Sequence, residues 1–115
     1  MSFDPTYREA TLTREEVDQL AGPVVLEFGA NWCGICGGFT PQAAQAFEPF
    51  PAVQHIRVED GPGKRLGRSF RVKLWPTFVF MLNGALVQQV SRPSIEEVRQ
   101  ALEAITAQAP PDTNP

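Results

Sequence analysis

Residues 24–36 read VVLEFGANWCGIC, and this stretch decides the fold of the chain. Its first part, residues 24–28, is β-branched and apolar on both faces apart from Glu27, as expected of a strand buried inside a parallel or mixed sheet. Its second part holds Cys33 and Cys36, which are separated by two residues and followed by a helix-like stretch. A Cys-x-x-Cys pair that enters a helix activates a thiol, so the pattern favours redox chemistry.

The composition describes one small acidic domain. A chain of 115 residues with 43% hydrophobic content can build one core and is too short for two domains. The net charge of -3 argues against nucleic acid as a partner. No run approaches the roughly 18 apolar residues that a membrane span needs, so no membrane association is expected. Residues 1–14 lack the apolar core of a secretory signal, which predicts a cytoplasmic protein.

Other uses of the cysteine pair are possible in principle. A structural disulfide is the plainest of them, although a lone pair this close is more often catalytic or metal-binding in a reducing compartment. A zinc site needs two further ligands, and His55 is the only histidine of the chain. An iron–sulfur cluster shared between two chains has no support in the sequence. We therefore predict neither a metal site nor a bound cofactor.

Capping and turn signals divide the rest of the chain into elements. Thr13 and Glu16 form a capping box that starts a short helix, and Ser94 caps a last amphipathic helix. Asn83-Gly84 favours a type I′ turn that joins two strands into an antiparallel hairpin. The expected strands are residues 24–28, 53–58, 77–82 and 85–90. Further helices are expected at residues 37–48, where Pro41 should kink the helix or end its first part, and around residues 66–70.

This order of elements predicts an α/β fold with a central mixed β-sheet and helices on both faces. We expect a single domain over residues 1–108. Residues 109–115 offer almost nothing to bury and are predicted to form a disordered tail.

Taken together, these features resemble the thioredoxin family over roughly residues 10–107. The resemblance is carried by WCGIC after a buried strand, an acid six residues before the first cysteine and Pro41 in the following helix. The stretch Trp75-Pro76-Thr77, the Asn83-Gly84 hairpin and the closing helix complete it. The order and spacing of these features are specific, although each alone is weak.

The resemblance assigns the chemistry to the two cysteines. Cys33 would be the exposed nucleophile, because unpaired N–H groups and the dipole at a helix start favour a thiolate. It would form a mixed disulfide with a target, and Cys36 would then attack Cys33 and release the reduced target.

Glu27 matches the family's buried acid, which is more often aspartate. Burial without a partner would raise its pKa, since desolvation disfavours a carboxylate. Glu27 would then exchange a proton with Cys36 through a water and assist the second step. The alternative is a strand-end acid that reaches solvent. His55 lies near a position where relatives carry a lysine, and we expect it to be an ordinary surface histidine.

The remaining site residues are expected at a substrate-binding rim. Pro76 resembles the family's cis-proline, which would expose the backbone of Trp75 to an extended peptide. The alternative is a trans proline that starts an edge strand. Grouped exposed apolar side chains favour binding of unfolded or extended segments. The expected substrate-binding residues are Trp32, Gly34, Ile35, Trp75 and Pro76, although Trp75 could instead pack into the core.

Three departures from the family pattern bear on activity. Ile35 replaces the usual proline between the cysteines, Gly37-Gly38 follows where relatives often have a lysine, and residues 91–93 replace a glycine that clears room for substrate. The prediction is a monomeric thiol–disulfide oxidoreductase that reduces disulfide-containing proteins and is recycled by a separate electron-donor reductase. The alternative is a binding or chaperone-like module on the same fold with little redox turnover.

Overall fold

The computed structural model describes residues 6–107, and the predicted tail at residues 109–115 lies outside them. This range contains four strands and four helices. Their order is α1 (Arg14–Val17), β1 (Pro23–Gly29), α2 (Gly34–Phe47), β2 (Gln54–Glu59), α3 (Arg65–Ser69), β3 (Thr77–Leu82), β4 (Ala85–Ser91) and α4 (Ile95–Thr106).

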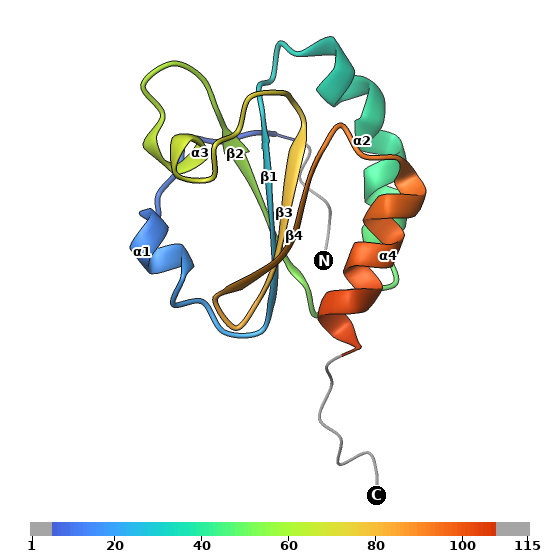
Figure 1. The fold of residues 1–115 in the computed structure, drawn as a ribbon. Coiled ribbons are helices and arrows are strands. Elements are labelled where there is room, and N and C mark those ends of the chain that lie inside the picture. The colour runs from blue at the N-terminus through green and yellow to red at the C-terminus, as the bar shows by residue number, and fades with distance from the viewer. Residues whose placement is uncertain (1–5, 108–115) are drawn as a thin grey trace, which may run out of the picture.

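The strands form one mixed sheet in the order β2-β1-β3-β4. β1 runs parallel to β2 and antiparallel to β3, and β3 pairs antiparallel with β4. Figure 1 shows α2 and α4 on one face of this sheet and α1 and α3 on the other. The predicted α/β fold with helices on both faces is therefore confirmed. β1 is buried because it lies inside the sheet between β2 and β3.

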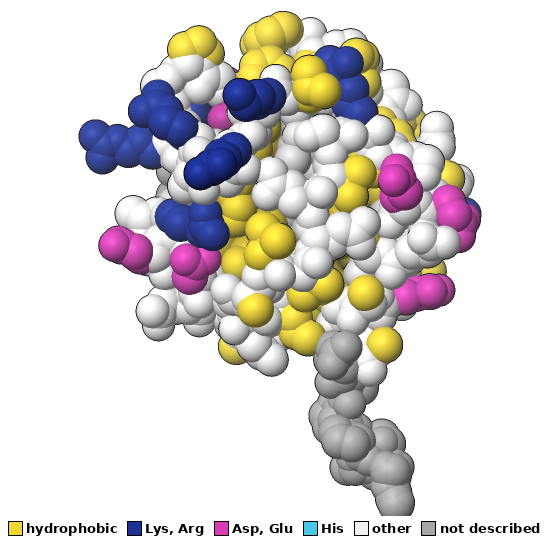
Figure 2. Space-filling model, viewed as in Figure 1, with side chains coloured by type: hydrophobic (Ala, Val, Ile, Leu, Met, Phe, Trp, Pro, Cys, Tyr) yellow, Lys and Arg dark blue, Asp and Glu magenta, His cyan; other side chains and the backbone are white. Residues whose placement is uncertain are grey.

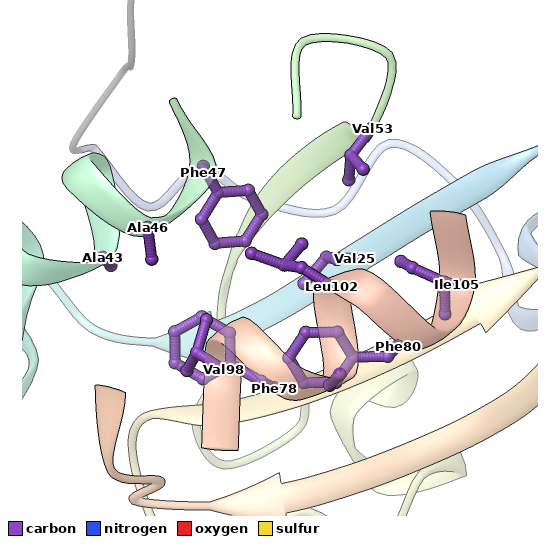
Figure 3. Close-up of a cluster of buried hydrophobic side chains, with 11 residues drawn as sticks. Val25, Ala43, Ala46, Phe47, Val53, Phe78, Phe80, Val98, Leu102 and Ile105 are labelled. Atoms are coloured by element: carbon purple, nitrogen blue, oxygen red, sulfur yellow. The ribbon is translucent and has the colours of Figure 1, made fainter. Parts of the chain in front are cut away.

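Each face of the sheet has its own apolar cluster. Under α2 and α4, Phe78 and Phe80 of β3 meet Val98, Leu102 and Ile105 of α4, as Figure 3 shows. The three α4 side chains recur at helical spacing, so one stripe of the helix faces the sheet. Burying each such side chain contributes about 1.5–3 kcal/mol. Ala43, Ala46 and Phe47 of α2 belong to the same cluster, so the helix that carries the cysteine pair is also packed on this core.

Local signals placed several elements correctly. The capping boxes of Thr13 with Glu16 and of Ser94 with Glu97 are both formed. Asn83 and Gly84 have φ values of 51° and 82°, so this two-residue loop has positive φ at both positions, as a type I′ turn requires. The expectation that Pro41 could end the first part of its helix was wrong, because α2 continues from Gly34 to Phe47.

The segment before α1 joins the free edge of the sheet. Arg8 makes a parallel bridge to Val58 of β2, with Arg8 N donating to the Arg57 carbonyl and Glu59 N donating to the Arg8 carbonyl. This bridge brings Tyr7 under the sheet, where its side chain is buried. A residue far from the cysteines in sequence is therefore held in the interior beside β1 and β2.

Candidate active site

The two cysteines lie at the N-terminus of α2 in unequal environments. Cys33 is the N-cap residue, and its Sγ accepts a hydrogen bond from the Cys36 backbone N–H at 3.3 Å. Cys33 is partly exposed, whereas Cys36 is 1% exposed, and both are free thiols. One sulfur can therefore meet a substrate, while the other lies one turn deeper on the same helix.

Burial keeps the Cys36 thiol protonated, and Cys36 must lose this proton before it can attack. Burial and a hydrogen bond with Cys33 raise the pKa of the Cys36 thiol to about 11, although bonds from the Ala30 backbone and the Tyr7 side chain act in the opposite direction. Near neutral pH this sulfur is a thiol. A reaction that needs its thiolate therefore needs a group that takes up the proton.

Glu27 is buried, but it does not lack partners. Its side chain is 1% exposed, and Arg57 donates to it through Nη2 at 2.8 Å and through Nε at 3.1 Å. Burial alone would raise the pKa of Glu27, but hydrogen bonds and charge from His55 and Arg57 outweigh it and lower that pKa. The expectation of a raised pKa was wrong because it considered desolvation without His55 and Arg57 on the neighbouring strand.

His55 was expected to be an ordinary surface residue, and this expectation was wrong. Its Nε2 lies 2.9 Å from Glu27 Oε1, and its ring stacks on Phe47 with centroids 4.0 Å apart. Only 12% of its side chain is exposed. The ring is therefore a mostly buried hydrogen-bond partner of the carboxylate.

Sequence reasoning missed Arg57 and Tyr7. Arg57 lies directly opposite Glu27 in the parallel register of β1 and β2. Because side chains alternate along a strand, Arg57 shares its face with His55, and this alternation could have identified it. Tyr7 donates its hydroxyl proton to Glu27 Oε2. No local pattern identifies Tyr7, since it reaches Glu27 through the bridge between Arg8 and Val58, which are far apart in the sequence.

The mouth of the site is apolar, as predicted. Trp32 is 78% exposed and Ile35 is 51% exposed, and Gly34 between the cysteines is open to solvent. Trp75 is half-buried, and its ring meets the Trp32 ring edge-on, with the ring centroids 5.4 Å apart. Trp75 Nε1–H donates to Asp60 Oδ2 at 2.9 Å. Figure 2 shows hydrophobic and basic side chains side by side at this end of the molecule. Trp75 therefore belongs to the rim and does not pack into the core.

The Trp75–Pro76 peptide bond is cis, as the resemblance implied. The neighbouring loop carries Arg92 at a positive φ of 51°, in the region where the sequence departs from the family. A groove of about 270 Å³ opens between this loop and α2. Its lining residues are Ile35, Gly38, Phe39, Pro76, Arg92 and Pro93.

Residues 6–107 offer neither a metal site nor a membrane-spanning helix. No cluster of three or more His, Cys, Asp or Glu side chains there is arranged to hold a metal ion. In the same range, no helix has the length and apolar character to cross a membrane.

Comparisons with known proteins agree with this geometry. The family model described as Thioredoxin matches residues 6–104. Thioredoxin 2 from Pseudomonas aeruginosa PAO1, solved in its reduced form, matches with a TM-score of 0.79 and 48% identity, covering 90% of this chain and 97% of that one. Thioredoxin Asp f 28 of Aspergillus fumigatus is 28% identical over 76% of this chain and 82% of its own length. Thioredoxin H-type 1 of Nicotiana tabacum is 33% identical over 69% of this chain and 63% of its own length.

Proposed function

This chain belongs to the thioredoxin family and is a thiol–disulfide oxidoreductase, and we propose that Cys33 and Cys36 are its attacking and resolving thiols. The observation that carries the assignment is their unequal exposure at one helix start. Cys33 is partly exposed at the N-cap, while Cys36 is buried one turn deeper. Only Cys33 can meet the sulfur of a target protein.

The proposed reaction has two displacement steps. The Cys33 thiolate attacks one sulfur of a target disulfide, the target's S–S bond breaks, and the other target sulfur leaves as a thiolate that takes up a proton. Cys36 then loses its proton and attacks Cys33 Sγ. The Cys33–Cys36 disulfide forms and the second target thiol is released. The target gains two electrons and the protein loses two, which a separate electron-donor reductase returns.

The rim would bind the target as an extended segment. Trp32, Gly34 and Ile35 offer an exposed apolar surface on one side of the sulfur, and Trp75 with the cis-Pro76 offers a backbone edge on the other. A proline has no N–H to compete with a peptide that pairs with this edge. Protein disulfides in flexible or unfolded segments are therefore the proposed substrates.

Glu27 is the proposed acid–base group of the second step. The partners of Glu27 lower its pKa and keep the carboxylate ionised, so it can accept a proton. Glu27 and Cys36 are both buried. The single domain over residues 1–108, the monomeric state, the absence of a bound cofactor and the cytoplasmic location also stand as proposals. Size-exclusion chromatography and cell fractionation would test the oligomeric state and the location.

Insulin reduction with dithiothreitol as donor tests the assignment. The wild type should accelerate precipitation of the reduced insulin chains, and Cys33→Ser should reduce the rate to that of dithiothreitol alone. Cys36→Ser should accumulate a mixed disulfide with insulin that mass spectrometry detects at Cys33. A wild-type rate no higher than that of Cys33→Ser would instead support a thioredoxin-fold binding module.

A further inference from the structure

Arg92 is the one charged residue, within residues 6–107, that lines the groove between α2 and the loop after β4. The other lining residues are Ile35, Gly38, Phe39, Pro76 and Pro93. α2 supplies one wall of this groove, and none of its 14 residues is charged. A target segment that enters the groove therefore meets a single cation against an uncharged wall.

The backbone around Arg92 is held in place on both sides. The Arg92 N–H donates to the Pro76 carbonyl at 2.7 Å, and the next residue, Pro93, is buried. On the other side, Ser91 Oγ lies 2.9 Å from Thr77 Oγ1. The Arg92 side chain therefore starts from a fixed point beside the cis-proline, and less conformational freedom is lost when it binds a partner.

Only part of the Arg92 guanidinium is used in the free protein. Its Nε donates to the Trp75 carbonyl at 2.9 Å, and the residue is exposed. Glu96 and Glu97 follow in α4, but neither forms an ion pair with Arg92 in the part of the chain that the structure describes. The two Nη groups thus remain as a planar fork, which matches the geometry of a carboxylate.

Docking of a target changes the partner of this guanidinium. An extended segment that pairs with the edge at Trp75 needs the Trp75 carbonyl, which Arg92 holds. With a neutral target, the displaced guanidinium returns to water. With a target that carries a carboxylate beside its cysteine, the guanidinium gains two charge-assisted hydrogen bonds in exchange for the one that it gives up. An acidic target therefore offsets the cost of opening the docking edge.

We propose that Arg92 selects target disulfides in which an acidic residue flanks the attacked cysteine. This inference names a substrate class for the proposed function and rests on it. The target carboxylate binds the Arg92 fork at the groove, and the freed Trp75 carbonyl pairs with the target backbone. Arg92 acts on docking alone and takes no part in the two displacement steps.

Single-turnover reduction of matched peptides tests this selection. Each substrate is a short peptide, blocked at both ends and dimerised through its single cysteine. Glutamate or glutamine occupies one of the two positions on either side of that cysteine. Acid quenching and chromatography give the second-order rate constant with reduced protein, and the rate with dithiothreitol corrects for the intrinsic reactivity of each peptide. At one flanking position at least, the wild type should reduce the glutamate peptide about three- to tenfold faster than the glutamine peptide.

Variants separate a contact with Arg92 from a general attraction between charges. Arg92→Gly should bring the ratio of the two rate constants to about one. Arg71→Gly is the matched control, because Arg71 is also exposed and has a positive φ of 58° but does not line the groove. It should keep the wild-type ratio. Arg92→Glu should reverse the preference, so that a lysine peptide reacts faster than the glutamate peptide. A purely structural role of the loop would change all rates together and leave the ratio unchanged.

The outcomes distinguish this inference from the function on which it rests. A wild type that reduces both peptides equally fast at every flanking position would refute the selection and leave the oxidoreductase assignment standing. Equal loss of the preference in Arg71→Gly and Arg92→Gly would also refute it, since the overall positive charge would then be the cause. A wild type that reduces no peptide faster than Cys33→Ser would refute the proposed function and the selection together.

Discussion

Arg92 caps the backbone carbonyl of Trp75: its Nε donates to the Trp75 oxygen at 2.9 Å. That oxygen is one of the groups that an extended substrate would use, so the side chain competes with the substrate. Arg92→Gly should therefore raise kcat/KM for a neutral disulfide-bridged peptide by about two- to tenfold, the value of one net hydrogen bond. Steady-state kinetics with that peptide measures the effect.

Arg71→Gly is the control for Arg92→Gly. Arg71 also has a positive φ, of 58°, so glycine relieves the same backbone conformation without freeing the Trp75 carbonyl. A similar gain in both variants, or a loss in Arg92→Gly, would contradict competition at the carbonyl.

Tyr7 is the only tyrosine, so tyrosinate absorbance reports on it alone. Burial and Glu27 raise its folded-state pKa. The stability that this group contributes is therefore full below its unfolded pKa of about 10 and is lost as the pH rises from there toward the folded-state pKa. The tyrosinate signal should appear together with loss of the far-ultraviolet circular dichroism. A tyrosinate signal that rises below about pH 10 in a folded protein would contradict the buried hydrogen bond.

Breaking the buried Arg57–Glu27 ion pair should lower the stability of the fold strongly. Arg57→Met leaves a buried carboxylate without its cation and should reduce the free energy of unfolding by about 3–5 kcal/mol. Urea titrations followed by circular dichroism measure this. The exposed Arg65→Met should change the value by no more than about 0.5 kcal/mol. Comparable losses in both variants would contradict the pairing.

The same pair determines the response to acid. Because its partners lower the folded-state pKa of Glu27, the pair contributes its full stability above the unfolded value of about 4.3. That contribution is lost as the pH falls through the lower folded-state value. Urea midpoints at mildly acidic pH should therefore fall with decreasing pH more steeply in the wild type than in Glu27→Gln. Parallel curves would contradict the pKa direction.

Trp32 is expected to act in binding and not in folding. Its ring is 78% exposed, so Trp32→Ala should change the free energy of unfolding by less than about 0.5 kcal/mol. It should raise KM for insulin about fivefold, since an exposed aromatic anchor contributes about 1 kcal/mol or more to an interface. Leu86→Ala, at an exposed apolar position on β4, should leave KM unchanged. Equal KM values for wild type and Trp32→Ala would remove this residue from the docking surface.

Local signals predicted much of the fold and only part of the site. Asn83-Gly84 and the two capping boxes act within a few residues, so the sequence reveals them directly. The cysteine pair also marks the start of the helix that contains it. The cis bond before Pro76 was accessible only through the resemblance, because few X-Pro bonds are cis.

The electrostatics of the site depend on contacts between distant segments. The sign of the Glu27 pKa shift depends on His55 and Arg57 of β2, which become neighbours of Glu27 only through strand register. His55 was misjudged for the same reason. Tyr7 lies before the first helix, and the bridge of Arg8 to β2 and hydrogen bonds with Asn31 fix its place. Pairing between strands, and not local propensity, decides which charges meet in this interior.

The two tryptophans of the chain, Trp32 and Trp75, touch each other beside the cysteine pair. Indole emission depends on the polarity around the ring, and the chain has no other tryptophan to add background. The intrinsic fluorescence of the unlabelled protein therefore comes from one end of the molecule. A protein that docks over Trp32 shields the ring from solvent and alters the emission, so candidate substrates can be screened optically without a dye or a tag.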